Sequence, residues 1–447
     1  MATPNPRQRA AALAQGLAGR YLWRPWFDRL ALSLMINGYS PLSRIWATGL
    51  ECDTPSALRD ALPQLSAGPP LNAAFATLHR RAGAYRAAEA VWESALFEGQ
   101  GDAAMAQTRR LATAQRFTHA RIPFGAVPGW WRVPAVRYEI SDAAAVLAAH
   151  GARLARPDAF PFAATKVQQS RVIDQAGRRT YWLRFPSTLG DTAWAKVVEP
   201  AGVIDPPTLI SLHGIAIESE MMVGVPDPFG ALVGQGVRVI YPEGPWHGRR
   251  RPHGWSAGEP VMGRAPLGML DLLAGWVGEV AVLSDWARRQ GSPRIGLAGT
   301  SLGALTAQRA AAASRHWPAG LQPDVLLLVT TSGDMLDVTL RGALARGLKV
   351  DAALAGAGWT PEALQPWRPL LDPGDMPPLD PANIMMVLGE ADRVTPYAGG
   401  AALAKVWGLP EANIFRRPRG HFSAAAAMPG EHEILAALAR RLIKAAA

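Results

Sequence analysis

The sequence predicts an α/β fold in which a mostly parallel sheet is covered by helices on both faces. Two observations support this fold class. From about residue 165 onward, short apolar runs alternate with longer helix-like runs. One of these junctions also carries Gly-x-Ser-x-Gly directly between an apolar run and an Ala-rich run. At 447 residues, the chain is long enough for one large domain or two.

The apolar runs have the length and bulk of buried strands, and helix-like runs follow most of them. Two strand-like segments come first, Arg171–Phe185 and Ala193–Val198. The later strand candidates are Thr208–His213, Val237–Pro242, Arg294–Ala298, Val325–Thr330, Ile384–Leu388 and Asn413–Arg416. The helix candidates are Leu267–Arg289, Leu302–Arg315 and Glu431–Ala446. In such a sheet, ligands bind beyond the carboxyl ends of the strands.

The chain divides into a helical N-terminal region, 1–150, and an α/β region, 165–447. Large apolar residues recur at helical spacing over Tyr21–Trp46 and Leu71–Phe97, and the region is rich in tryptophan. We expect a helical layer packed on the neighbouring domain, with a lid or a membrane-facing surface as the alternative. The stretch 335–381 is longer than a simple crossover, so it is either a small cap over the site or a helix with a long loop.

Charge, cysteine content and apolar runs indicate which kind of partner and which cellular compartment to expect. The net charge is +10, but the arginines are spread along the chain among acids, so no nucleic-acid partner is expected, whereas contact with anionic lipid stays open. The single cysteine, Cys52, excludes an internal disulfide and fits a reducing compartment. No apolar run reaches the length that spans a bilayer, since Glu279 interrupts the longest, and the N-terminus is a poor signal peptide. We therefore expect a cytoplasmic protein.

Ser301 is the candidate nucleophile. It stands between Gly299 and Gly303 at a predicted strand-to-helix junction, which is the pattern of a nucleophile elbow. The turn strains the serine backbone, and its flanking positions pack too closely for a side chain. The N–H groups at the start of the following helix point back toward the serine, where a developing oxyanion would lie.

A serine hydroxyl needs a base and an acid, and the chain offers both in the order Ser…Asp…His. His421 lies in a predicted loop between the last strand and the last helix, and we expect it to be the base. Asp392 follows the strand Ile384–Leu388, and we expect it to orient the imidazole. Asp334 follows the preceding strand and remains an alternative acid, with Glu390 as a third.

The oxyanion hole needs two backbone donors. One candidate is the N–H of Leu302, directly after the nucleophile. The other is the N–H of Ile215, in the His213-Gly214-Ile215 loop after the strand Thr208–His213. One strand later, the sequence Gly244-Pro-Trp-His-Gly248 precedes three arginines.

Taken together, these motifs resemble the α/β-hydrolase superfamily over roughly residues 165–447. They are the His-Gly loop, the Gly-Pro-x-His-Gly segment, the G-x-S-x-G elbow, the G-x-x-D-x-x-x-P acid loop and the late Gly-His, in that order. The resemblance implies hydrolysis of an ester, thioester or amide through a Ser-His-Asp triad and an acyl-enzyme, with no cofactor. Ala304 follows the elbow where prolyl-oligopeptidase-like peptidases commonly have a second glycine, which disfavours a peptidase.

Three other patterns have weaker functional interpretations. Arg249, Arg250 and Arg251 could hold an anionic group, but we expect a solvated arginine run. Glu243, His247 and His253 share no known ligand spacing, so no metal is expected. The glycines around Ser301 do not match a dinucleotide-binding motif, and no phosphate-binding loop is present in the sequence.

The sequence thus predicts a serine hydrolase, an esterase or lipase-like enzyme acting on a small-molecule or lipid ester. A non-catalytic binding or scaffold protein on the same fold is one alternative, and an acyltransferase is another. Acyl chain, head group and oligomeric state stay open.

Overall fold

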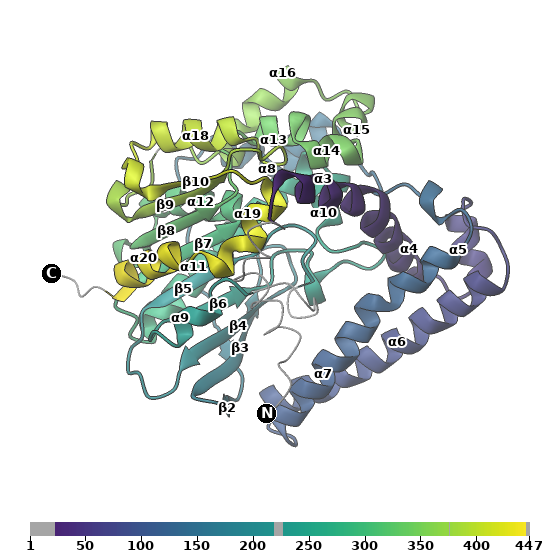
Figure 1. Ribbon diagram of the computed structural model, residues 1–447, viewed down its shortest axis with the longest axis horizontal. Helices are drawn as coiled ribbons and strands as arrows, with labels where there is room; N and C mark the ends of the chain where they lie inside the picture. Colours follow the sequence, from purple (N-terminus) through teal and green to yellow (C-terminus); the bar gives the residue numbers. More distant parts are fainter. Residues whose placement is uncertain (1–22, 219–226, 375, 444–447) are drawn as a thin grey trace.

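The computed structural model describes residues 23–218, 227–374 and 376–443. Within them, ten strands form one sheet in the order β1-β3-β4-β6-β5-β7-β8-β9-β10, with β2 paired to β3 (Figure 1). The strands are β1 Gln168–Gln169, β2 Ile173–Gln175, β3 Arg178–Pro186, β4 Thr192–Pro200, β5 Thr208–Leu212, β6 Arg238–Pro242, β7 Ile295–Thr300, β8 Val325–Val329, β9 Ile384–Gly389 and β10 Ile414–Arg417.

The sheet is parallel from β6 to β10 and antiparallel at the β1–β4 edge. β5 pairs with both β6 and β7, so the chain steps outward to β6 and then crosses back to β7. The mostly parallel sheet expected from the sequence is therefore confirmed. The carboxyl ends of β5, β7 and β9 meet at one edge, where Ser301, Asp392 and the loop after β5 lie.

One segment that the sequence predicts as a single strand forms two strands, β2 and β3. The segment Arg171–Phe185 contains a tight turn at Ala176 and Gly177, which have φ of 52° and 74°, and β2 folds back on β3 across it. The expectation of a continuous strand is wrong because the mostly polar run Asp174–Arg179, which contains Gly177, forms the turn of a short hairpin.

Helices cover both faces of the sheet (Figure 1). Along β8, Leu326 and Leu328 pack with one buried cluster, and Leu327 and Val329 with the other, because successive side chains point to opposite faces. The first cluster includes α11 Leu267–Arg289 and α12 Leu302–Ala313, and the second includes α9 Gly230–Val233 and α20 His432–Ile443. The last residues of the predicted helix Glu431–Ala446 lie outside the described residues.

The helix α11 is long and apolar enough to cross a membrane by length and composition, which was not expected from the sequence. In the fold, 72% of its apolar window is buried. Trp276, Val277 and Val280 are fully buried in the core that also holds the strands. The apolar character of α11 is thus explained by burial, because one side of the helix packs on the sheet and other elements cover its opposite side.

The described part of 1–150 is helical and has its own core. Its α-helices are α3 Pro25–Leu34, α4 Ser40–Glu51, α5 Pro55–Ala61, α6 Pro69–Glu93, α7 Ala103–Thr118 and α8 Ala143–Leu154, and the first 22 residues lie outside the described residues. The long pair α6 and α7 lies to one side of the sheet (Figure 1). Trp92 at the end of α6 packs against Trp182 of β3 and Trp194 of β4, with ring centroids 5.2 and 6.0 Å away.

The stretch 335–381 forms five short α-helices before β9 rather than one helix with a long loop. They are α13 Met335–Arg341, α14 Ala343–Leu348, α15 Val350–Gly356, α16 Pro361–Leu364 and α17 Arg368–Leu371. Residue 375 lies outside the described residues. Apolar side chains from these helices join the core cluster that also contains Leu302 and Leu305 of α12.

Candidate active site

Ser301 sits on a sharp turn between β7 and α12. Its φ of 56° and ψ of −120° are strained for a residue with a side chain. A Cβ on Gly299 would collide with the backbone of Gly303, and a Cβ on Gly303 would collide with the Leu212 carbonyl. Glycine at both flanking positions therefore lets β7, β5 and α12 approach closely enough to hold the serine on this turn.

The structure brings His421 and Asp392 to this serine. His421 Nε2 lies 2.8 Å from Ser301 Oγ, and His421 Nδ1 lies 2.8 Å from Asp392 Oδ2. His421 and Asp392 are both only 6% exposed. With Nδ1–H donating to the carboxylate, Nε2 is left as the acceptor for the serine hydroxyl, which is the tautomer that a general base requires. His421 begins α19, His421–Ala427, so the predicted loop position is the first residue of a short helix.

The Asp392 carboxylate is held by its own loop. The N–H groups of Val394 and Thr395 donate to Oδ1 at 2.8 and 3.0 Å. Thr395 Oγ1 lies 2.9 Å from Oδ2 and equally far from the Thr330 carbonyl. These bonds leave Oδ2 directed at the imidazole. Thr395 was not predicted as a site residue, although its place three residues after the acid in the acid loop was a usable signal.

The alternative acids point elsewhere. Asp334 accepts a hydrogen bond from Asp337 N at 2.8 Å, as the cap of α13, and pairs with Arg368 Nη2 at 2.6 Å. Glu390 is exposed. Neither is placed at His421 by the contacts of the described residues, whereas Asp392 is.

Leu302 and Ile215, the candidate oxyanion donors, both lie close to the serine. Leu302 is the first residue of α12, and Ile215 follows Gly214, where a Cβ would contact the Ser301 side chain at 3.5 Å. Both residues line the same cavity as Ser301. Both residues are thus near Ser301, and their role as oxyanion donors stays a prediction.

Two histidines brace the loop that carries Ile215. His213 Nε2 accepts from Gly244 N at 3.0 Å, so its Nδ1 carries the proton and donates to the Gly214 carbonyl at 2.8 Å. The His247 ring is fully buried and lies edge-on to the His213 ring, with centroids 4.8 Å apart. Burial lowers the pKa of His213 to about 4, and burial together with the nearby His213 holds the pKa of His247 well below its usual value. In the sequence, His247 was noted as part of the Gly-Pro-x-His-Gly segment and as a weak metal-ligand candidate, and its packing against His213 was not predicted.

The expectation that the three arginines form a solvated run is wrong. Arg249 and Arg250 side chains are 9% and 1% exposed. Arg250 pairs with Asp191 and Glu279 at 2.8 Å, while Arg249 pairs with Glu243 and lies over the Trp194 ring at 4.3 Å. These guanidinium groups bind the chain's own carboxylates and aromatic rings. Consecutive charges look solvated in a sequence because most of the partners that bury them, here Asp191, Glu279 and Trp194, lie far away along the chain.

The candidate metal ligands Glu243, His247 and His253 do not form a cluster in the structure. His253 is largely exposed and lies 3.7 Å from Glu51, and Glu243 binds Arg249. Among the residues that the structure describes, no group of three His, Cys, Asp or Glu side chains is placed to hold a metal ion.

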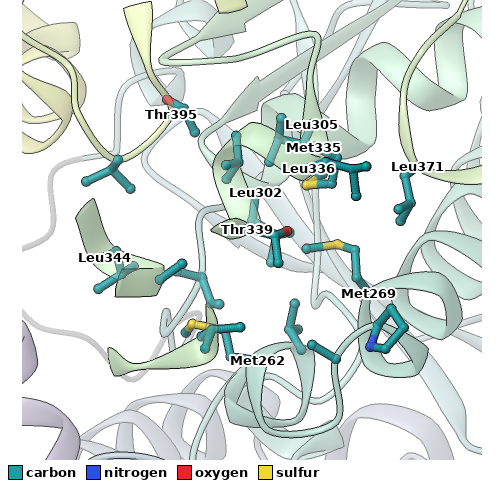
Figure 2. Close-up of a pocket in the computed structure, with 18 of the residues that line it drawn as sticks. Met262, Met269, Leu302, Leu305, Met335, Leu336, Thr339, Leu344, Leu371 and Thr395 are labelled. Atoms are coloured by element: carbon teal, nitrogen blue, oxygen red, sulfur yellow. The ribbon is translucent and has the colours of Figure 1, made fainter. Parts of the chain in front are cut away.

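An apolar cavity of about 90 Å³ opens at Ser301 (Figure 2). Its walls come from the loop after β5, from α10 Glu259–Gly263, from the start of α11, from α12 and from α13–α17. Figure 2 shows Met262 and Met269 on one side of this space, and Leu302, Leu305 and Thr395 on the other. The described residues that line it carry no charged side chain. The cavity is therefore suited to an uncharged apolar group next to the serine.

No protein-family profile and no curated relative matches the chain. Among solved structures, the chain is similar to an acetyl xylan esterase from Paenibacillus sp. R4, with 14% identity, a TM-score of 0.44, and coverage of 64% of this chain and 92% of that one. It is also similar to acetyl xylan esterase 1 from Thermoanaerobacterium sp. JW/SL YS485, with 16% identity, a TM-score of 0.44, and coverage of 66% and 95%. A third is brefeldin A esterase, described as a bacterial homologue of human hormone-sensitive lipase, with 16% identity, a TM-score of 0.41, and coverage of 67% and 84%.

The class of protein is defined by the fold itself. A mostly parallel sheet in which β5 and β6 exchange places, an antiparallel strand at β4, and a strained serine between β7 and α12 make up the α/β-hydrolase fold. The subfamily within that fold is not assigned.

Proposed function

We propose that the protein is a serine hydrolase that cleaves carboxylic esters, with Ser301 as the nucleophile, His421 as general base and acid, and Asp392 as the orienting carboxylate. The observation that carries the proposal is the unbroken Ser301–His421–Asp392 chain of contacts, 2.8 Å at each step, on a strained elbow. This arrangement activates a hydroxyl that is otherwise a weak nucleophile at neutral pH.

The reaction then proceeds in two halves. Ser301 Oγ attacks the ester carbonyl carbon while its proton moves to His421 Nε2, and the Leu302 and Ile215 N–H groups stabilise the oxyanion. The tetrahedral intermediate breaks its bond to the leaving oxygen, to which His421 returns the proton, leaving an acyl-enzyme. Water attacks this ester with His421 again taking the proton, and the carboxylic acid leaves as Ser301 regains its hydrogen.

The cavity supports a substrate with a short apolar acyl group. Its volume of about 90 Å³ is smaller than the cavity of about 150 Å³ that is known to admit benzene in an engineered protein. Its charge-free lining disfavours an ionised acyl group, because burying an unpaired charge there would be costly. We expect acetyl and butyryl esters to be better substrates than octanoyl and palmitoyl esters.

The decisive test combines a fluorophosphonate probe with Ser301→Ala. The wild-type protein should be labelled at Ser301 and hydrolyse short p-nitrophenyl esters, and the variant should show neither property. Labelling that persists in Ser301→Ala would refute the assignment of the nucleophile. A labelled wild-type protein that releases no acid, but passes its acyl group to an added alcohol, would instead identify an acyltransferase.

A further inference from the structure

One carboxylate of the helical N-terminal region reaches the turn that carries His421. Asp28 of α3 accepts hydrogen bonds from Phe422 N at 2.6 Å and Ser423 N at 3.1 Å through Oδ1. Its Oδ2 accepts from Gly420 N at 3.2 Å and from the Ser423 hydroxyl. Asp28 lies 392 positions before Gly420 in the chain, so this contact is purely tertiary.

These donors need an acceptor from elsewhere. The first N–H groups of a helix have no carbonyl partner within the helix, and the side chain of the preceding residue usually supplies one. Here the preceding residue is Gly420, which has no side chain. A Cβ at Gly420 would collide with the Asp28 carboxylate. Glycine at 420 thus leaves the space in which a carboxylate from α3 caps the turn.

The same turn sets the position of the base. Gly420 and Phe422 are the chain neighbours of His421, and the backbone N–H groups of both donate to the Asp28 carboxylate. Ser423 Oγ also accepts a hydrogen bond from Gly420 N at 3.0 Å, which links the residue before α19 to the first turn of the helix. The loop that carries Asp392 contacts the residues just before His421, since Ala391 N donates to the Arg419 carbonyl at 2.9 Å. The backbone of His421 is therefore held from α3 on one side and from the acid loop on the other.

We infer that Asp28 is a positioning residue for the reaction proposed above, fixing the His421 backbone so that its ring spans Asp392 and Ser301. This inference rests on the proposed function. A base must stay within hydrogen-bond distance of the hydroxyl it deprotonates, and small displacements at a reacting centre cost large factors in rate. The helical region thereby contributes to the active site through the base and not through contact with the substrate.

The test is steady-state hydrolysis of p-nitrophenyl acetate by Asp28→Ala, Asp28→Asn and a control, Asp102→Ala. Asp28→Ala should lower kcat by about 10- to 100-fold with KM changed less than about twofold. Asp28→Asn retains an oxygen for the Phe422 and Ser423 N–H groups and should recover part of the rate. Asp102 caps α7 by accepting from Ala104 N and Met105 N, so Asp102→Ala removes an equivalent cap in the same region and should leave kcat unchanged.

A double-mutant cycle separates positioning from general loss of structure. If Asp28 acts through His421, Asp28→Ala should have no further effect on the residual rate of His421→Ala. An equal fractional loss in both backgrounds, or a wild-type kcat for Asp28→Ala, would overturn the inference. If Asp28→Ala does not fold, the same cycle is measured with Asp28→Asn, and its rate loss in the wild-type and His421→Ala backgrounds tests the inference. Failure of the proposed function is distinguished by Ser301→Ala, which would then keep its activity.

Discussion

At the residue scale, the choice of acid depends on what each carboxylate binds. Asp392 is 6% exposed and is directed at His421 by two backbone N–H groups. Asp334 uses one oxygen to cap α13 and the other to bind Arg368. The two residues follow neighbouring parallel strands, so their positions in the sheet are similar and their hydrogen-bond partners make the difference.

We expect Asp392→Asn to lower kcat by about 10⁴-fold, because an amide at this position no longer holds the imidazole tautomer. Asp334→Asn should leave kcat within a fewfold of wild type and lower stability by less than about 1 kcal/mol, because asparagine caps a helix as well as aspartate and only the partly exposed pair with Arg368 loses its charge. Ester hydrolysis and thermal unfolding of the two variants, with circular dichroism to show that both are folded, make the comparison. A larger kcat loss for Asp334→Asn would reverse the assignment.

At the element scale, the short helices α13–α17 shape the apolar cavity at Ser301. Leu364 and Leu370 come from adjoining helices of this group and are each 1% exposed. Leu364 lines the cavity, whereas Leu370 is buried in the core without lining it. The pair therefore separates the effect of cavity shape from the effect of lost packing.

Leu364→Ala should shift the preference of the enzyme toward longer acyl chains by about tenfold in relative kcat/KM, since the shortened side chain widens the cavity. Both Leu364→Ala and Leu370→Ala should lose about 2–5 kcal/mol of stability, as buried leucines do. The measurement is kcat/KM over acetyl to octanoyl p-nitrophenyl esters. Equal profiles for the two variants would show that this wall of the cavity does not contact the acyl group.

At the scale of the whole molecule, the helical N-terminal region is joined to the sheet by tryptophans and by ion pairs. Trp92 is fully buried between α6 and the β3–β4 edge, with the Arg110 and Arg249 guanidinium groups 4.2 and 4.7 Å from its ring. Asp28 adds a polar contact from α3 to α19. The helical region is thus docked on the sheet by large aromatic surfaces and by charged groups that are paired.

Global stability should fall as the pH drops from about 6.5 toward 4, because His213 and His247 are buried in the neutral form. In this window the unfolded chain takes up protons that the folded chain does not, so each such histidine lowers the free energy of unfolding by about 1.4 kcal/mol per pH unit. Urea unfolding at pH 7.5, 6.0 and 5.0 measures the slope. His247→Met should reduce that slope, whatever its effect at pH 7.5, and an unchanged slope would exclude His247 as a cause.

The sequence alone determined the fold class and the local chemistry of the elbow. Apolar runs of strand length, the two glycines around Ser301 and the order of Ser301, Asp392 and His421 are local or ordinal features, and a single chain displays them directly. The hairpin within Arg171–Phe185 was missed although Gly177, inside a mostly polar run, is a turn signal that the sequence displays.

Only the tertiary structure decided which groups meet across long separations. Arg249 and Arg250 look like solvated charges in the sequence, but the carboxylates of Asp191 and Glu279 and two tryptophans from other elements enclose them in the fold. Asp28 carried no signal at all, because a helix cap is normally local and here it comes from 392 positions away. The physical reason is common to both cases. Burial and hydrogen bonding are properties of spatial neighbours, and a buried charge or an uncapped turn is tolerated only when the fold brings it a partner.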